Sequence, residues 1–270
     1  MTLIAAFRRR VRNQTELVFV SDSRLSGGQS LDFAQKIFLL PRSDALFAFA
    51  GDTRYAYPLL MQMIRAVEGY PNSVDRRLPL AKLKGHTLRV FQQTYDAIHS
   101  LPIGSTFPEA PDNFFLLGGY DWQACDFLAW RLSFDRQSRR FVFRSILRPG
   151  GRPFFFSSDD KSAVSLAVGN TSKLLIARGK SDNQMNLEPV EVLADIIRSR
   201  SFPSIGGAPQ VAKAYMHSNT RLFQVHWPLG DSSEWPHVAG RPLLPGERST
   251  LPAFDPVSGV FSTSFTQRDT

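Results

Sequence analysis

The sequence predicts an α+β fold in which two antiparallel sheets are covered on their outer faces by pairs of helices. Strand-like runs occur in groups, and stretches with apolar residues at helical spacing separate those groups, unlike the alternating pattern of a βαβ repeat. The chain has 270 residues, of which 43% are apolar, enough for one large domain with a substantial core. Two sheets with helix pairs outside would bury the apolar faces of all these elements.

Four short strands are expected at the start of the chain. The first two are apolar, and the polar segment between them, which contains Arg8, Arg9 and Arg10, is interpreted as a solvated hairpin loop. The third stops at Pro41, where the composition favours a turn, and the fourth is closed by Gly51. The four runs are residues 2–7, 17–20, 36–40 and 45–50.

Helices and further strands follow. Apolar residues at helical spacing predict two helices, then a group of strands, then a second helical region before the last strands. Asn186 is expected to cap the final helix. The helices are expected over residues 53–68, 80–100, 171–177 and 187–199, and the strands over residues 114–117, 127–134, 141–147, 165–168, 211–215 and 222–225.

The composition changes at Trp227. Six prolines fall among glycine, serine and charged residues in the remaining segment, which disfavours a continuous helix or a central strand. The chain is therefore divided into a domain over residues 2–226 and a proline-rich arm or tail over residues 227–270, outside the sandwich. Trp227 and Trp235 could dock the arm onto a surface.

Composition also limits the functional class. Cys125 is the only cysteine, so no internal disulfide can form, which is compatible with a reducing cytoplasm. No apolar run is long enough to span a membrane, and the N-terminus lacks the order of a secretory signal. The net charge of +8 could favour nucleic acid, but the basic residues are scattered along the chain. We therefore expect a cytoplasmic protein with no membrane partner, and a nucleic-acid-binding protein is the less favoured alternative.

Several short segments resemble those of proteasome β-subunits and their bacterial relatives such as HslV and Anbu. A strand starts at Thr2, and a second strand ends in Ser-Asp-Ser-Arg at residues 21–24, where the family shows an alanine, an aspartate, a small hydroxyl residue and an arginine. Lys-Ile-Phe follows at residues 36–38, and Phe-Ala-Gly-Asp at residues 49–52 precedes a helix. Residues 118–121 are similar to a later glycine-rich strand end. The resemblance runs from Thr2 to about Val225.

This resemblance implies a four-layer αββα sandwich, the fold of the N-terminal-nucleophile (Ntn) hydrolases. It also implies a homo-oligomer that cleaves peptide or amide bonds in a peptide or protein substrate, with a nucleophile at the N-terminus. Whether an ATPase partner assists is left open. Threonine at the second position is small enough for Met1 to be removed by methionine aminopeptidase, without a longer propeptide.

Residues of the matching segments are assigned roles by the same resemblance. The hydroxyl of Thr2 is the nucleophile and its own α-amine is the base. Lys36 lies beside Thr2 and favours the neutral amine and the developing alkoxide, while Asp22 holds Lys36. Gly51 offers its backbone N–H to the carbonyl oxygen as negative charge develops there. Phe49 lines the substrate pocket, with core packing as the alternative.

Two departures from the family keep a second interpretation open. Active members carry Gly-Ser-Gly where residues 169–171 are Gly-Asn-Thr, and an aspartate that residues 201–207 lack. Asn170 and Ser204 could partly substitute as supporting residues. A non-catalytic assembly subunit of the same fold is therefore the alternative function. No cofactor or metal is expected, because the five histidines show no ligand spacing.

Overall fold

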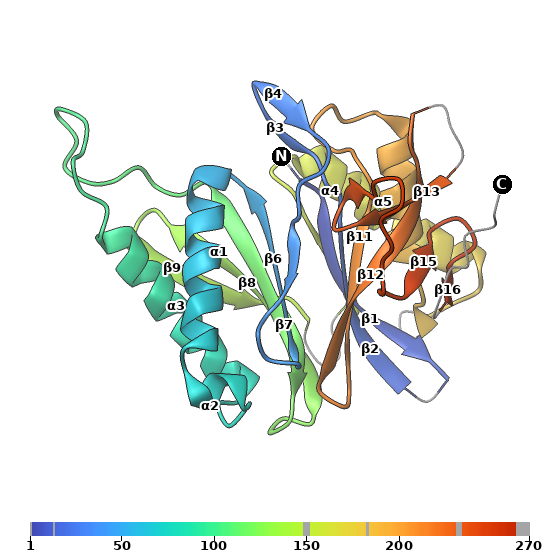
Figure 1. Ribbon diagram of the computed structural model, residues 1–270, viewed down its shortest axis with the longest axis horizontal. Helices are drawn as coiled ribbons and strands as arrows, with labels where there is room; N and C mark the ends of the chain where they lie inside the picture. Colours follow the sequence, from blue (N-terminus) through green and yellow to red (C-terminus); the bar gives the residue numbers. More distant parts are fainter. Residues whose placement is uncertain (1, 13, 148–151, 182–183, 231–233, 263–270) are drawn as a thin grey trace.

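A computed structural model describes residues 2–12, 14–147, 152–181, 184–230 and 234–262. Most of its strands belong to two sheets, and each sheet carries helices on its outer face (Figure 1). The expected α+β class with antiparallel sheets is confirmed. Five helices are described: α1 (Thr53–Glu68), α2 (Pro71–Val74), α3 (Leu80–Asp96), α4 (Lys161–Ala177) and α5 (Glu188–Ser199).

The first sheet has nine strands in the described residues. Its main path runs β10-β1-β2-β11-β12-β13-β14, and β15 adds to β12 in parallel with β16 beside it. The strands are β1 (Ile4–Val11), β2 (Gln14–Ser21), β10 (Phe154–Ser157), β11 (Gln210–Tyr215), β12 (Asn219–Pro228), β13 (Glu234–Val238), β14 (Arg241–Pro242), β15 (Ala253–Asp255) and β16 (Val260–Ser262). This sheet carries the start of the chain in its interior.

The second sheet is a five-stranded antiparallel meander in the order β5-β6-β7-β8-β9. A short hairpin of β3 (Leu25–Gly27) and β4 (Gln29–Leu31) stands apart from both sheets. The strands of the second sheet are β5 (Ile37–Leu39), β6 (Ala45–Gly51), β7 (Asn113–Asp121), β8 (Asp126–Asp135) and β9 (Arg140–Ser145).

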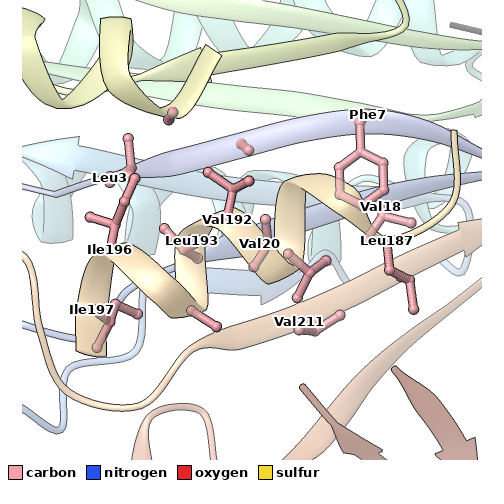
Figure 2. Close-up of a cluster of buried hydrophobic side chains, with 14 of the residues drawn as sticks. Leu3, Phe7, Val18, Val20, Leu187, Val192, Leu193, Ile196, Ile197 and Val211 are labelled. Atoms are coloured by element: carbon pink, nitrogen blue, oxygen red, sulfur yellow. The ribbon is translucent and has the colours of Figure 1, made fainter. Parts of the chain in front are cut away.

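Side chains of β1 alternate between the two faces of the first sheet, and each face belongs to a different hydrophobic core. Leu3, Ala5 and Phe7 pack into a core with α4 and α5, whereas Ile4 and Ala6 pack into a core shared with the second sheet. Successive side chains of a strand point to opposite faces, so one apolar run serves both cores. Figure 2 shows the first of these cores, where α5 lies against β1, β2 and β11. A third core lies between the second sheet and helices α1 and α3.

The arginine-rich segment is strand rather than the expected solvated loop. β1 and β2 stay paired from Ile4↔Ser21 to Val11↔Gln14. The reason is that carboxylates accept the arginines: Arg8 donates to Asp126 of β8 at 2.9 Å and Arg9 donates to Glu16 at 3.1 Å. The polar composition thus reflects ion pairs along a strand.

The segment before and within α4 also differs from expectation. Residues 165–168, expected as a strand, are helical, because α4 starts at Lys161 behind the N-cap Asp160. Its buried residues recur at every fourth position, at Ala163, Ala167, Thr171 and Leu175, which is a helical repeat. The strand that adjoins this helix is β10, which the sequence analysis did not find. Asn186 is not the cap of α5 either: Leu187 holds that position, and Asn186 accepts a hydrogen bond from Arg9.

The sequence predicts an arm outside the sandwich after Trp227, but the described part of this segment extends the first sheet. β13 pairs with β12, and β15 pairs with β12 in parallel. Phe254 is 1% exposed and belongs to the same core as Leu3. Pro242 lies in the two-residue β14 at the edge of the sheet, where proline is tolerated, whereas Pro236 lies within β13.

Candidate active site

Thr2 lies immediately before β1 and is 2% exposed. Its position is fixed by its neighbour: the N–H of Leu3 donates to Oδ1 of Asp22 at 3.0 Å, and the N–H of Asp22 donates to the carbonyl of Leu3 at 3.2 Å. This reciprocal pair continues the β1–β2 ladder beyond Ile4↔Ser21. The start of the chain is therefore held at the end of β2.

Lys36 brings the predicted residues together. Its side chain is fully buried, and Nζ donates to Oγ1 of Thr2 at 2.7 Å, to Oδ1 of Asp22 at 3.0 Å and to the carbonyl of Arg24 at 2.5 Å. An ammonium group has three hydrogens, so these three acceptors match its full donor capacity. The geometry directs one N–H at the threonine hydroxyl.

Asp22 is held as firmly as the lysine it contacts. Besides Leu3 and Lys36, it accepts from the backbone N–H groups of Arg24 and Gly206, both at 3.1 Å. Both carboxylate oxygens are therefore used. Because the donors come from four segments of the chain, Asp22 connects the start of β1, the turn after β2, the residue before β5 and the loop before β11.

Burial dominates the electrostatics of this pair. It lowers the pKa of Lys36 and raises that of Asp22, while the attraction between the two groups and the backbone N–H donors oppose both shifts. A lysine whose pKa is lowered exchanges a proton more readily near neutral pH than an exposed one. Lys36 can therefore stabilise a developing alkoxide on Thr2 and take part in moving its proton.

Gln210 is a supporting residue that the sequence analysis missed. Its Oε1 accepts from the N–H of Lys36 at 2.9 Å and of Ile37 at 3.3 Å, and its Nε2 donates to the carbonyl of Ala34 at 2.7 Å. The side chain is 1% exposed at the first position of β11. It fixes the backbone that carries Lys36, but a lone glutamine before a strand gives no signal of this role.

Gly51 ends β6 at the same end of the second sheet as Lys36. The N–H of Phe49, two residues before Gly51, donates to the carbonyl of Lys36 at 3.2 Å. Gly51 has a φ of +99°, and a Cβ there would lie 2.4 Å from the carbonyl oxygen of Asp112. Glycine is therefore required by the backbone, and the oxyanion role stays a prediction.

The structure places Phe49 in the core on the helix side of the second sheet. It is fully buried, and its ring contacts Tyr57 edge-on with centroids 5.0 Å apart and stacks on Phe38 at 6.4 Å. These contacts belong to the core with α1 and α3. Packing therefore accounts for Phe49 without a substrate.

The two supporting residues lie in different settings. Asn170 is nine positions beyond the start of α4, roughly 13 Å along the helix axis from its N-terminus. The N-terminus of α4 is the end that adjoins β1, because β10 pairs Ser157 with Ile4. The structure thus does not bring Asn170 to Thr2. Ser204 is 3% exposed in the loop whose Gly206 contacts Asp22, and its Oγ has no hydrogen-bond partner among the described residues.

Other sites in the described residues are few. No group of His, Cys, Asp or Glu there is arranged to hold a metal ion. In the same part of the chain, no helix combines the length and apolar character needed to cross a membrane. Cys125 is exposed on the turn between β7 and β8, far in the sequence from the Thr2 group.

Comparison with solved structures identifies the fold. The chain is similar to a mutant of Anbu from Hyphomicrobium sp. strain MC1, with a TM-score of 0.53 and 15% identity over 89% of each chain. It is also similar to Anbu, described as an ancestral beta-subunit, from Yersinia bercovieri, with a TM-score of 0.54 and 14% identity over 82% of this chain and 86% of that one. No protein-family profile and no curated protein sequence matches the chain. The structural likeness confirms the resemblance to the proteasome-like family at the level of the fold.

Proposed function

We propose that this protein is a proteasome-like N-terminal threonine hydrolase that cleaves peptide or amide bonds. One observation carries the proposal: the buried ammonium of Lys36 donates to the hydroxyl of Thr2 at 2.7 Å while Asp22 holds it from the other side. The contact satisfies one of the three N–H groups of the buried ammonium. It also has a chemical consequence, because an ammonium at this distance stabilises the alkoxide that attacks a carbonyl.

The reaction follows from these groups. Once Met1, which lies outside the described residues, has been removed, the α-amine of Thr2 accepts the hydroxyl proton. Oγ1 then bonds to the substrate carbonyl carbon, and the negative charge on the carbonyl oxygen is stabilised by the N–H of Gly51. The C–N bond breaks as the α-ammonium returns a proton to the leaving amine. Water, deprotonated by the same amine, then hydrolyses the ester and regenerates Thr2.

The arrangement of the three cores supports a four-layer αββα sandwich of the Ntn-hydrolase class. We infer in addition a homo-oligomer in the cytoplasm that acts on peptide or protein substrates, with Ser204 as support. The boundary expected between residues 226 and 227 falls inside β12, so we propose a single domain that includes the described segment after Trp227. These statements rest on the family resemblance and on the Thr2–Lys36–Asp22 group.

The test combines intact mass with labelling. Protein purified from its native host should lack Met1, and an epoxyketone, which bonds to both a hydroxyl and an adjacent amine, should add one equivalent at Thr2. Thr2→Ala should remain unlabelled. Retention of Met1 on the native protein would reject the mechanism and favour the alternative, a non-catalytic assembly subunit of the same fold. Light scattering that reports a monomer of 30.3 kDa would reject the oligomer.

A further inference from the structure

The connection between β10 and α4 passes the start of the chain. β1 and β10 are antiparallel, with Ile4 opposite Ser157 and Ala5 opposite Phe156. Continuing this register two residues past the last ladder pair places Asp159 opposite Thr2. Residues opposite one another in an antiparallel pair have Cβ atoms about 5 Å apart. Asp159 itself lies in the bend between the end of β10 at Ser157 and the start of α4, so this bend neighbours the candidate nucleophile.

The next carboxylate along the chain, that of Asp160, belongs to the start of α4. Asp160 is the N-cap of α4, and its Oδ1 accepts from the N–H groups of Ser162 at 2.8 Å and Ala163 at 3.3 Å. Ser158 accepts from the N–H of Asp160 at 3.1 Å. Asp159 is not part of this cap and is exposed, although it adjoins a buried site. The negative charge of Asp159 raises the pKa of Lys36, although burial has the larger effect and lowers it.

Charge balance gives this carboxylate a role after Met1 is removed. The α-amine of Thr2 would then be a second cationic group beside the ammonium of Lys36. Asp22 already accepts from Lys36 and three backbone N–H groups, and Asp32 is paired with Arg24 at 2.6 Å. Two adjacent cations with one saturated carboxylate repel each other. A second carboxylate close to Thr2 removes that imbalance.

We propose that Asp159 is a positioning residue that holds the α-amino group of Thr2 in the processed chain. The inference rests on the proposed function and deepens it, because the amine is the base of the reaction. Held by a carboxylate, the amine is kept near Oγ1 and its protonated form is favoured. Asp159 also opposes the effect of Lys36, which favours the neutral form. The other charged groups around Lys36 are Asp22 and Asp32, which raise its pKa, and Arg24, which pairs with Asp32.

The experiment measures the amine itself, so that it does not depend on turnover. The chain is produced as a fusion and cleaved to begin at Thr2, which is verified by intact mass. Acetylation of the α-amine by limiting acetic anhydride is then followed by mass spectrometry from pH 5 to 10, and the midpoint gives the pKa of the amine. Asp159→Asn should lower the midpoint by on the order of 1 unit. Asp159→Glu should restore it in part.

Asp160→Asn is the matched control, since it removes the same charge one residue away. Asparagine is as good an N-cap as aspartate, so this variant should keep α4 intact and leave the midpoint in place. Equal midpoints for wild type and Asp159→Asn, or equal shifts for Asp159→Asn and Asp160→Asn, would overturn the proposal. Epoxyketone labelling of the same cleaved wild-type protein tests the proposed function separately, because labelling can succeed whether or not Asp159 moves the midpoint.

Discussion

The backbone N–H of Gly206 donates to Oδ2 of Asp22 at 3.1 Å, and this contact ties the loop before β11 to the end of β2. Through it, a residue near the end of the domain supports the carboxylate that holds Lys36. The candidate site is therefore assembled from segments some 200 positions apart in sequence, and its geometry depends on the docking of β2 against β11.

Replacing Asp22 should weaken the whole protein as well as the site. Asp22→Asn leaves the ammonium of Lys36 buried without an opposite charge and puts an amide NH₂ against backbone donors. Breaking a buried pair of this kind typically lowers the free energy of unfolding by about 3–5 kcal/mol. Urea unfolding measures the change. Asp22→Asn combined with Lys36→Met should recover part of the loss.

Asp32→Asn is the control for that change. Asp32 pairs with Arg24 at 2.6 Å, but both side chains are partly exposed, and such pairs contribute about 0–1 kcal/mol. If the Asp22 and Asp32 variants lost equal stability, the buried pair would not have the central role described here.

Gly51 should not tolerate a side chain. Alanine there would hold a φ of +99° and place its Cβ 2.4 Å from the carbonyl oxygen of Asp112. We expect Gly51→Ala to lower the free energy of unfolding by about 2 kcal/mol or more. Gly27→Ala is the control, because nothing lies within 4 Å of its added Cβ, and it should change stability by less than about 0.5 kcal/mol. Equal effects in urea unfolding would show that β6 can move away from Asp112.

Phe254 tests whether the segment after Trp227 is part of the core. It is 1% exposed and stacks on Phe261 with ring centroids 4.5 Å apart. Phe254→Ala should cost about 3–5 kcal/mol in unfolding free energy. Val257→Ala, at a side chain 66% exposed, should stay within about 0.5 kcal/mol. A Phe254 variant as stable as wild type would restore the interpretation of this segment as a detached arm.

Lys213 should make stability depend on pH. Burial lowers its pKa to about 8, although Glu16 lies 3.1 Å away. In the unfolded chain its pKa is about 10.4, so between these values the folded protein binds fewer protons. The free energy of unfolding should therefore be lowest below pH 8 and rise toward pH 10, by on the order of 2 kcal/mol. Tyr215, with a pKa raised to about 12, opposes this only above pH 10.

Lys213→Met should flatten that rise, whereas Lys173→Met, on the exposed side of α4, should preserve it. Chemical denaturation at pH 7, 8.5 and 10 distinguishes the two. A rise of the same size in the Lys213 variant would assign the pH dependence to other groups.

Local sequence signals were enough for much of the fold and for the centre of the site. The strand ends at Asp22 and Gly51 and the lysine before β5 carry recognisable patterns, and they locate three of the residues that matter. The position of Asp159 could not be read in this way, because it depends on β10 pairing with β1 across some 150 residues. Gln210 escaped notice for the same reason, since its partners lie on a distant segment.

Composition alone predicts the wrong structure in two places where strand pairing decides it. The run of arginines in β1 predicts a solvated loop, but Arg8 pairs with Asp126 and Arg9 pairs with Glu16, and these pairs allow the run to be a strand. The prolines after Trp227 disfavour a central strand, but not short edge strands that extend the sheet. In both cases the structure of the segment depends on the neighbouring strand, which composition does not reveal.

The reaction itself should treat Thr2 and Lys36 as one unit. Thr2→Ala removes the nucleophile and should abolish epoxyketone labelling while preserving the fold, whereas Thr2→Ser should label more slowly. Lys36→Ala removes the N–H that contacts Oγ1 at 2.7 Å and should lower the labelling rate by about 10³-fold or more. The double variant should be no worse than Thr2→Ala alone, because each change disables the same step. Thr171→Ala, at a fully buried threonine on α4, is the control and should label at the wild-type rate. Rapid labelling of Lys36→Ala would show that the α-amine activates Thr2 without the lysine, and the role assigned to the Thr2–Lys36 contact would fail.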